Sequence, residues 1–595
     1  MLRIHSGRRD EGAALVIVVA VGAVLALFMA IVVTNSVNGT RQARSDADWN
    51  AALAAAYAGI DEYQSRLSAD TSYYRYGNAS APFSSTSTLS TPPVANPAFG
   101  IGAGGTWAAL AGSDDRAEFR YEVDNSKYPT TGRIRVRSTG KVGDATRTVV
   151  ADLKQQGFID FLYFTDYEVQ DPSVAGTSSS GCFTDAAKTT LRYSWNGRPT
   201  GSTCNEIAFG PNDVTEGPVH SNDTIRACGA TFTGTVTTAK PTSPFFLARD
   251  SNYSTCAAPT FELAGYPVHS GGVIGMPPTN SQLKKETRSD LTADEVPRPG
   301  CLYTGPTQIT FFANGTMNVK SPFTKKTRIG NAAATTGSEP AACGTITALQ
   351  SAGGATITVP ENNVIYVQNV PAITSDVNHW PSSTNPSSFT CTSTGDSTRR
   401  GWSVGSGPSK TGYPATIGSQ TEASPTGTTY GCRAGDVFVK GTVDGAVTVA
   451  AENYVFVVGD LTYEDDNDDM LGLVGNNAVW VWNPISTGGS NMTADHRTIE
   501  AAILSVAHTF QVQNFDRGNS QGTLTVMGAI AQKYRGTVAR ASGGTILSGY
   551  GKRYIYDERF KFRAPPKFLN PVTTTYGVTS WVESAAVWAP DGSAR

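Results

Sequence analysis

Two stretches of this sequence carry side chains that could act on a substrate or hold a metal. Gly401-Trp402-Ser403-Val404-Gly405 has the G-x-S-x-G pattern, in which the serine is a nucleophile only when a strand precedes it and a helix follows. The flanking segments STGDSTRR and SGPSKTGYP are typical of neither element. The sequence therefore disfavours a nucleophilic Ser403, and it predicts no catalytic residue.

The acidic run at 464–469 offers oxygen ligands of the kind that calcium prefers. A calcium loop counted from Asp465 would need glycine where Met470 stands and glutamate where Asn476 stands. A solvated acidic turn is favoured over a metal site. The histidines lack HExxH or paired spacing, so no metal and no cofactor is predicted; they are His5, His220, His269, His379, His496 and His508.

The eight cysteines all lie between residues 182 and 432, and none forms a CxxC motif. An even number confined to one region indicates disulfides formed in an oxidising compartment. Eight cysteines permit 105 pairings. We expect neighbours in the sequence to pair, because short loops close at the lowest entropic cost: Cys182 with Cys204, Cys228 with Cys256, Cys301 with Cys343, and Cys391 with Cys432.

These regions follow an apolar N-terminal run from Ala13 to Thr34. As a helix its 22 residues would extend roughly 33 Å, enough to cross a hydrocarbon core of about 30 Å. The run is too long for a cleaved signal peptide and ends without an A-x-A site. Arginines before it favour a cytoplasmic N-terminus in a single-pass protein, with residues 35–595 outside the cytoplasmic membrane.

The helix is expected to continue beyond the membrane run, to residue 68. Apolar residues recur there in steps of three and four, which is typical of one face of an amphipathic helix. A bend at Gly39 is the alternative. The stripe predicted to pack consists of Trp49, Leu53, Ala56, Ile60, Tyr63 and Leu67.

The segment DEGAALVIVVAV resembles the N-terminus of type IV pilin-like proteins, in particular the PilX-like minor pilins and the K-type pseudopilins. The resemblance implies that residues 1–12 are a leader and that a prepilin peptidase cuts between Gly12 and Ala13. Most major pilins have glutamate at the fifth mature position, where this chain has Ile17. That departure resembles minor subunits at a filament tip. An uncleaved signal anchor is the alternative.

Beyond the helix the sequence predicts strands. A linker is expected at 69–116, and the alternation at 117–157, including GRIRVRSTGKVGDATRTVVADL, resembles pilin-like strand pairs with turns at Gly140 and Gly143. A connecting region at 158–204 precedes many short strands with Gly and Asn corners. We expect a β-solenoid or β-helix at 205–550, with a β-sandwich as the alternative, and a C-terminal extension at 551–595.

Segments such as GDVFVKGTVDGAVTVAAENYVFVVGDLTY look like extracellular domains that follow PilX-like N-termini in Gram-positive bacteria, actinobacteria in particular. The expected function is accordingly that of a non-enzymatic minor pilin-like structural protein at filament initiation or at a filament tip. Its expected partners are the membrane, a prepilin peptidase and other pilin-like subunits, to which the helix stripe would dock.

Two other functions remain open from the sequence. One is an anchored surface adhesin or wall-binding protein that contacts a surface polysaccharide through Trp380, Trp402, Trp480 and Trp482. The other is a β-helix enzyme acting on polysaccharide, for which spacing identifies no carboxylate pair. Charged residues make up 16% of the 595 residues and the net charge is −3, so nucleic acid is not indicated as a partner.

Overall fold

The computed structural model describes residues 11–595, except 71, 103–104, 115, 129–131, 156, 177–178, 212, 251–252, 271, 294, 393–400, 407–409, 414–429, 494, 543–544 and 572–575. The chain forms two compact units. Unit 1 comprises Met1–Gln155 and Thr575–Arg595, and unit 2 comprises Gln156–Thr574. Unit 2 is therefore an insertion in the sequence of unit 1.

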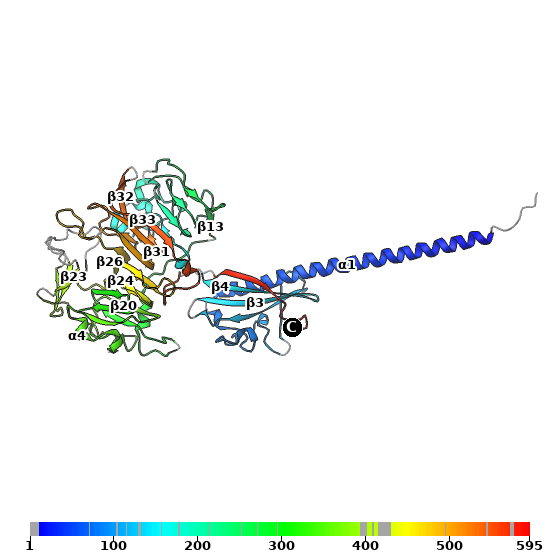
Figure 1. Cartoon of the computed structure of the whole chain (residues 1–595), viewed down its shortest axis with the longest axis horizontal. Helices are drawn as coiled ribbons and strands as arrows, with labels where there is room; N and C mark the ends of the chain where they lie inside the picture. Colours follow the sequence, from blue (N-terminus) through cyan, green and yellow to red (C-terminus); the bar gives the residue numbers. More distant parts are fainter. Residues whose placement is uncertain are drawn as a thin grey trace, which may run out of the picture. The chain divides into compact units, whose positions relative to one another are not determined.

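Unit 1 consists of the long helix α1 (Glu11–Ala69) and a five-stranded antiparallel sheet in the order β1-β2-β3-β4-β34 (Figure 1). The strands are β1 (Ala108–Ala109), β2 (Ala117–Asp124), β3 (Arg133–Val142), β4 (Ala145–Gln155) and β34 (Tyr576–Ser584). The predicted pilin-like strands at 117–157 correspond to β2, β3 and β4. The predicted C-terminal extension is wrong in part, because β34 returns to pair with β4.

The segment predicted as a linker at 69–116 is also part of unit 1. It contains the 3₁₀ helices η1 (Tyr73–Arg75), η2 (Pro82–Ser84) and η3 (Pro97–Phe99) as well as β1. Tyr73 and Phe99 are buried in the core against β2, and the Asn96 side chain caps η3. Its Ser, Pro and Gly content predicted a loop, but its aromatic residues complete the core.

Unit 2 is built mainly of parallel strands in three ladders, and we name the longest ladder A. Its strands, in the order in which they pair, are β14 (Cys301–Thr304), β20 (Asn363–Gln368), β25 (Ala446–Ala451), β27 (Met470–Gly475), β29 (Arg497–Ser505), β31 (Ser520–Tyr534), β5 (Tyr163–Tyr167), β7 (Val219–Ser221), β10 (Val236–Thr238) and β13 (Val268–His269).

Ladder B begins with β15 (Thr307–Phe312), β24 (Val437–Val443), β26 (Tyr454–Tyr463), β28 (Ala478–Val481) and β30 (Gln511–Val512). Ladder C runs through β24, β26, β29 and β31 to β33 (Thr545–Tyr556), β6 (Val214–Glu216), β9 (Thr231–Phe232) and β12 (Thr260–Phe261). A further parallel pair joins β8 (Ile225–Arg226) to β11 (Phe246–Leu247).

The remaining elements are short. Antiparallel strands are β16 (Thr316–Lys320), β17 (Arg328–Ile329), β18 (Gly337–Ser338), β19 (Ala355–Thr358), β21 (Phe389–Thr392), β22 (Gly401–Val404), β23 (Thr411–Tyr413) and β32 (Ala539–Ser542). The helices are η4 (Phe158–Asp160), α3 (Pro172–Ala175), η5 (Ser180–Cys182), η6 (Ser194–Asn196), η7 (Gly201–Cys204), η8 (Ser281–Thr287), η9 (Ala341–Cys343), α4 (Ile346–Leu349) and η11 (Glu558–Lys561).

The strands of ladder A do not follow the order of the sequence. Strand β5 comes early in the chain, yet it pairs with β31, near the end of unit 2. The chain therefore enters in the middle of the ladder, reaches one end at β13, and crosses back through residues 270–300 to the other end at β14. In Figure 1 the colours run from green at β20 to orange at β31, whereas the strands beyond β31 return to cyan and then to green at β13.

The returning segment at 270–300 covers apolar side chains on the outer face of ladder A. Ile274 and Leu283 pack in one cluster with residues such as Phe164, Val474 and Leu504. Buried asparagines fix the segment at two points. The Nδ2 of Asn280 donates to the carbonyl of Ala451 at 2.7 Å, and Asn222 exchanges two hydrogen bonds with the backbone of Ile274. This cover explains why ladder A is apolar on both faces.

Candidate assembly helix and other candidate sites

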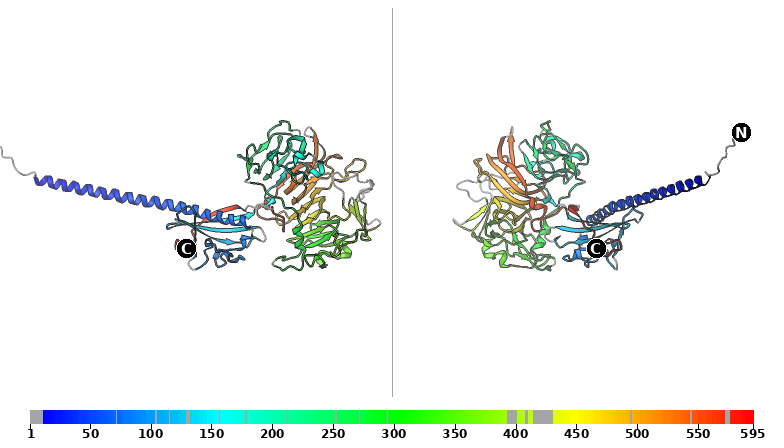
Figure 2. Two further views of the ribbon diagram at one scale, coloured as in Figure 1. Left: turned by 180° about the vertical axis from the view of Figure 1, so that it is seen from behind. Right: turned by 45° about the vertical axis from the view of Figure 1, so that its right-hand side comes forward.

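The first half of α1 is apolar and has no protein against it. From Ala14 the helix contains a window with a mean hydropathy of 3.2, none of which is buried. Figure 2 shows this half extending beyond the sheet of unit 1 as one continuous helix. Such a long exposed apolar surface needs lipid or another apolar partner, and its length and composition suit a membrane span.

The positions with predicted roles in processing lie at the start of this helix. Helix α1 begins at Glu11, so Gly12 and Ala13 are in its first turn, whereas residues 1–10 of the predicted leader lie outside the described part of the chain. Ile17 is 62% exposed on the apolar half. Its side chain therefore forms part of the surface that faces lipid or a partner.

The second half of α1 packs against the sheet of unit 1. Ala56, Ile60, Tyr63 and Leu67 of the predicted stripe are buried, whereas Leu53 is half-buried and Trp49 is 50% exposed. The expectation that this stripe docks on other subunits is wrong for the four buried residues, because the chain's own sheet covers them. Helical spacing identified the buried face but not its partner.

Close packing between α1 and the sheet depends on glycine. Gly140 lies inside β3, not in the turn predicted for it, and a Cβ atom there would overlap the backbone of Ala52 and Ala56. Gly59 on the helix is equally tight against Ser138 and Phe119. Only Gly143 of the two predicted turn glycines is in the turn, with a φ of 55°. The sequence pattern did not indicate that small residues of α1 and β3 face each other, as Gly140 does with Ala52 and Ala56.

A polar cluster sits at the centre of this interface. The hydroxyl of Tyr121 donates to Glu62 at 2.7 Å and accepts from the Nδ2 of Asn96 at 2.7 Å. Burial, and then the charge of Glu62, raise the pKa of Tyr121 well above its usual value. Tyr63 packs edge-on to Tyr121 at 5.2 Å between centroids. These bonds fix α1 on the sheet.

The serine motif at 401–405 does not form a nucleophile elbow. Strand β22 pairs with β21 and β23 on its two sides, and Ser403 lies opposite Thr390 and Gly412 within that antiparallel sheet. The strand-to-helix turn that exposes a nucleophile is absent at these described residues.

The tryptophans that an adhesin would use are mostly internal. Trp402, Trp480 and Trp482 are at most 3% exposed and pack with Phe438 and Phe456 on the outer face of ladder B. Only Trp380 is partly accessible, and its Nε1 donates to the carbonyl of Phe323. The structure therefore contradicts a contact role for the three buried tryptophans.

The acidic run at 464–469 is a turn held by internal bonds. Asp469 accepts hydrogen bonds from the backbone amides of Gly445, Glu464 and Asp465. Arg563 pairs with Asp468 at 3.1 Å. Among the described residues, no group of three or more His, Cys, Asp or Glu side chains is placed to hold a metal ion.

All four disulfides join neighbouring cysteines, as predicted: Cys182–Cys204, Cys228–Cys256, Cys301–Cys343 and Cys391–Cys432. Their Cα–Cα distances are 5.5–5.8 Å. All four lie in unit 2, and one of them, Cys301–Cys343, joins the first residue of β14 to η9.

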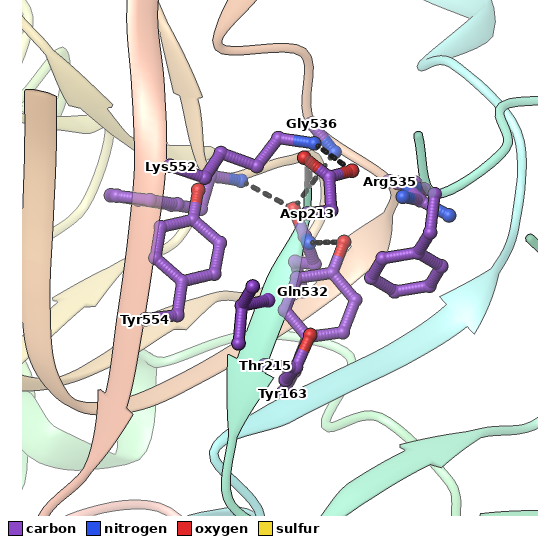
Figure 3. A pocket seen from close by; sticks show the side chains of 11 residues that line it. Tyr163, Asp213, Thr215, Gln532, Arg535, Gly536, Lys552 and Tyr554 are labelled. Atoms are coloured by element: carbon purple, nitrogen blue, oxygen red, sulfur yellow. Dashed lines mark hydrogen bonds and ion pairs between the residues drawn. The ribbon is translucent and has the colours of Figure 1, made fainter. Parts of the chain in front are cut away.

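Buried charges gather where β31 meets β5, which the sequence did not indicate. Arg535, 2% exposed, donates to Glu168 at 2.9 Å, and Lys552 pairs with Asp213 at 2.9 Å (Figure 3). Burial opposes the charge of Asp213, but Lys552, the backbone amide of Gly210 and Arg535 together more than offset burial and lower the pKa of this carboxyl.

Arg535, Asp213 and Lys552 line a small cavity, together with Tyr163 and Tyr554. Its volume is about 10 Å³, which accommodates one water molecule. Arg198, Glu206 and Arg226 continue the network of buried ion pairs nearby. The arrangement suits a structural connection between the two parts of ladder A.

No family model matches this chain, and no curated protein matches it. Among solved structures, it is similar to the competence-associated pilin ComZ from Thermus thermophilus. The two are 12% identical, and the comparison covers 90% of this chain and 96% of that one with a TM-score of 0.22. A TM-score of this size carries no argument about fold or function.

Proposed function

We propose that this protein is a non-enzymatic, minor pilin-like structural subunit, held in the cytoplasmic membrane before assembly and presenting unit 2 outside the cell. The observation that carries the proposal is the division of α1. Its first half is apolar and exposed, and its second half is fixed on an antiparallel sheet through small residues. Such a helix can stay in the bilayer or pack with other helices while its sheet remains outside.

The three parallel ladders of unit 2 support a β-solenoid in preference to a sandwich, since a sandwich is built of antiparallel sheets. In the proposed solenoid, the long strands β24, β26, β29 and β31 each contribute to two ladders, whereas the shorter ladder strands contribute to one. The four disulfides fit an oxidising exterior, which supports the proposed extracellular location of this unit.

Ile17 supports a position at a filament tip. By resemblance to pilins, a glutamate at this position pairs with the N-terminal amine of a neighbouring subunit. A charge in the hydrocarbon core is costly, at least about 2.5 kcal/mol at the bilayer centre and less towards its edge. A subunit with Ile17, which lies near the start of the apolar run, avoids this cost without that partner. It can therefore begin or cap a filament, and the large unit 2 suits a subunit that is not repeated along a thin shaft.

Processing and assembly are tested together by Gly12→Leu. We expect this variant to keep residues 1–12, as read by mass spectrometry of the N-terminus, and to remain in the membrane without surface filaments. Gly22→Leu is the matched control, because Gly22 lies in the same apolar half with open space around it. It should be processed normally.

Location gives the second test of the proposal. Labelled protein should mark filament ends at low copy, and protease added to wall-stripped cells should digest residues 35–595. Normal filaments with unprocessed Gly12→Leu protein, or dense labelling along the shaft, would instead support an anchored surface protein. Full protection from protease would overturn the proposed orientation.

A further inference from the structure

The two ends of the parallel ladders in unit 2 are finished differently. At the end formed by β14 and β15, every residue of β14 is buried. Strand β16 pairs antiparallel with β15, and β19 pairs with β16. Leu349 of α4 and Met317 of β16 are fully buried in the core cluster of the ladders. This end is closed by the chain itself.

The opposite end consists of β11, β12 and β13, and we call it the open end. Each of these strands pairs on one side only, with β8, β9 and β10 respectively, within the described part of the chain. None of their residues is fully buried. Their second edges therefore offer backbone groups to another strand.

The open end also leaves the last layer of the apolar core partly uncovered. Phe261 stacks on the buried Phe232 at 5.3 Å between centroids, and Phe246 meets Phe261 edge-on at 5.2 Å. Both outer rings are only half-buried, and the neighbouring Leu263 is 42% exposed. Aromatic rings beside unpaired strand edges are the features of an interface core.

We propose that the open end binds the open end of a second copy of this chain. Three strand edges must be met at once, at the positions fixed by the ends of ladder A, ladder C and the β8–β11 pair. A partner with the same three edges matches all of them at the usual strand spacing of about 4.8 Å. The open end of a second copy provides this arrangement, whereas the closed end of the chain does not.

Charge permits this contact between identical surfaces. Lys240 and Arg249 lie near the open end with Asp250 and Glu262, two positive and two negative groups, so identical ends do not repel each other through net charge. The contact is isologous, with one surface used by both copies, and association stops at a dimer because the other end is closed. This inference rests on the ladders and not on the proposed pilin-like role.

The test uses the full chain in detergent, with its mass measured by sedimentation equilibrium at micromolar concentrations. The wild type should have the mass of two copies. Thr260→Lys combined with Leu263→Lys places like charges across the two-fold axis, and we expect the dissociation constant to rise at least about tenfold. Both side chains are exposed, so the fold should be retained, as checked by circular dichroism.

Ile373→Lys is the matched control, since Ile373 is a 68% exposed apolar residue of unit 2 outside the open end. It should dimerise like the wild type. A second measurement needs no variant: on dilution of the wild type, amide exchange should increase in β11, β12 and β13 but not in β14. A monomeric wild type, or a dimer that neither the lysine pair nor dilution affects at these strands, would overturn the proposal.

Discussion

Units 1 and 2 are stabilised in different ways. Unit 1 contains no cysteine and packs one long helix on five strands, so a single continuous interface buries its core. Unit 2 is made of many short strands, several only two residues long, and contains all four disulfides. Short strands that meet from distant parts of the chain lose much entropy on pairing, and the disulfides reduce that loss.

The two units also differ in how they place charge. In unit 1, Arg137 pairs with the buried Glu122 but keeps 17% of its own side chain exposed. In unit 2, both members of the pairs Arg198–Glu206 and Arg535–Glu168 are at most 2% exposed. The comparison indicates that unit 2 depends on buried polar contacts where its non-consecutive strands meet.

The largest effect is expected at the buried ion pairs of unit 2. Glu206→Gln removes the carboxylate that pairs with both Arg198 and Arg226. Arg198 keeps its buried partner Asp223, but Arg226 is left as a buried cation without its carboxylate, which should cost about 5 kcal/mol of unfolding free energy in urea titrations. The carboxylate of Glu339 is 41% exposed beside Lys326. Glu339→Gln should therefore change the unfolding free energy by less than about 0.5 kcal/mol. Equal losses would contradict the distinction between buried and exposed pairs.

A pH effect should follow from Asp436 in unit 2. Burial raises the pKa of Asp436 to about 7, although it accepts hydrogen bonds from Tyr454, Asn453 and Gly431. The folded state thus holds the proton more tightly than the unfolded state, and stability is lost as the pH rises from about 4 to about 7. Relative to Asp436→Asn, the wild type should lose about 4 kcal/mol of unfolding free energy over this pH range, as measured in urea titrations. Parallel pH profiles would refute this assignment.

Removing one disulfide should affect unit 2 alone. The double variant Cys182→Ser with Cys204→Ser opens a loop with a sequence separation of 22 residues. This should lower the unfolding free energy of unit 2 by about 3 kcal/mol. Hydrogen exchange resolved by peptide should show faster opening in unit 2 and no change in β2, β3 and β4. Faster exchange in those three strands would mean that the units do not unfold separately.

The smallest effect should appear in unit 1. Gly140→Ala forces α1 away from β3 and should destabilise unit 1 by about 2 kcal/mol in the same exchange experiment. Gly577→Ala is the control, because Gly577 is also a strand glycine but has open space at its Cβ position. Its effect should stay within about 0.5 kcal/mol. Equal destabilisation by the two variants would mean that close packing at Gly140 does not hold α1 on the sheet.

The sequence by itself determined the local features of this protein. The apolar run and the three-and-four spacing predicted α1, because helical periodicity needs only neighbouring residues. Alternation predicted β2, β3 and β4, and short loop lengths predicted the disulfide pairs. Each of these depends on contacts between residues close in the chain.

Only the tertiary structure decided which distant segments meet. In the folded chain, β34 pairs with β4 in the sheet of unit 1 and β5 pairs with β31. Trp480 is buried in the core, and Gly140 contacts α1. Strand edges carry the same backbone groups whatever their sequence, so alternation cannot specify which edge a strand will join. That choice is made by packing the whole core, where the side chains of all the segments must fit together.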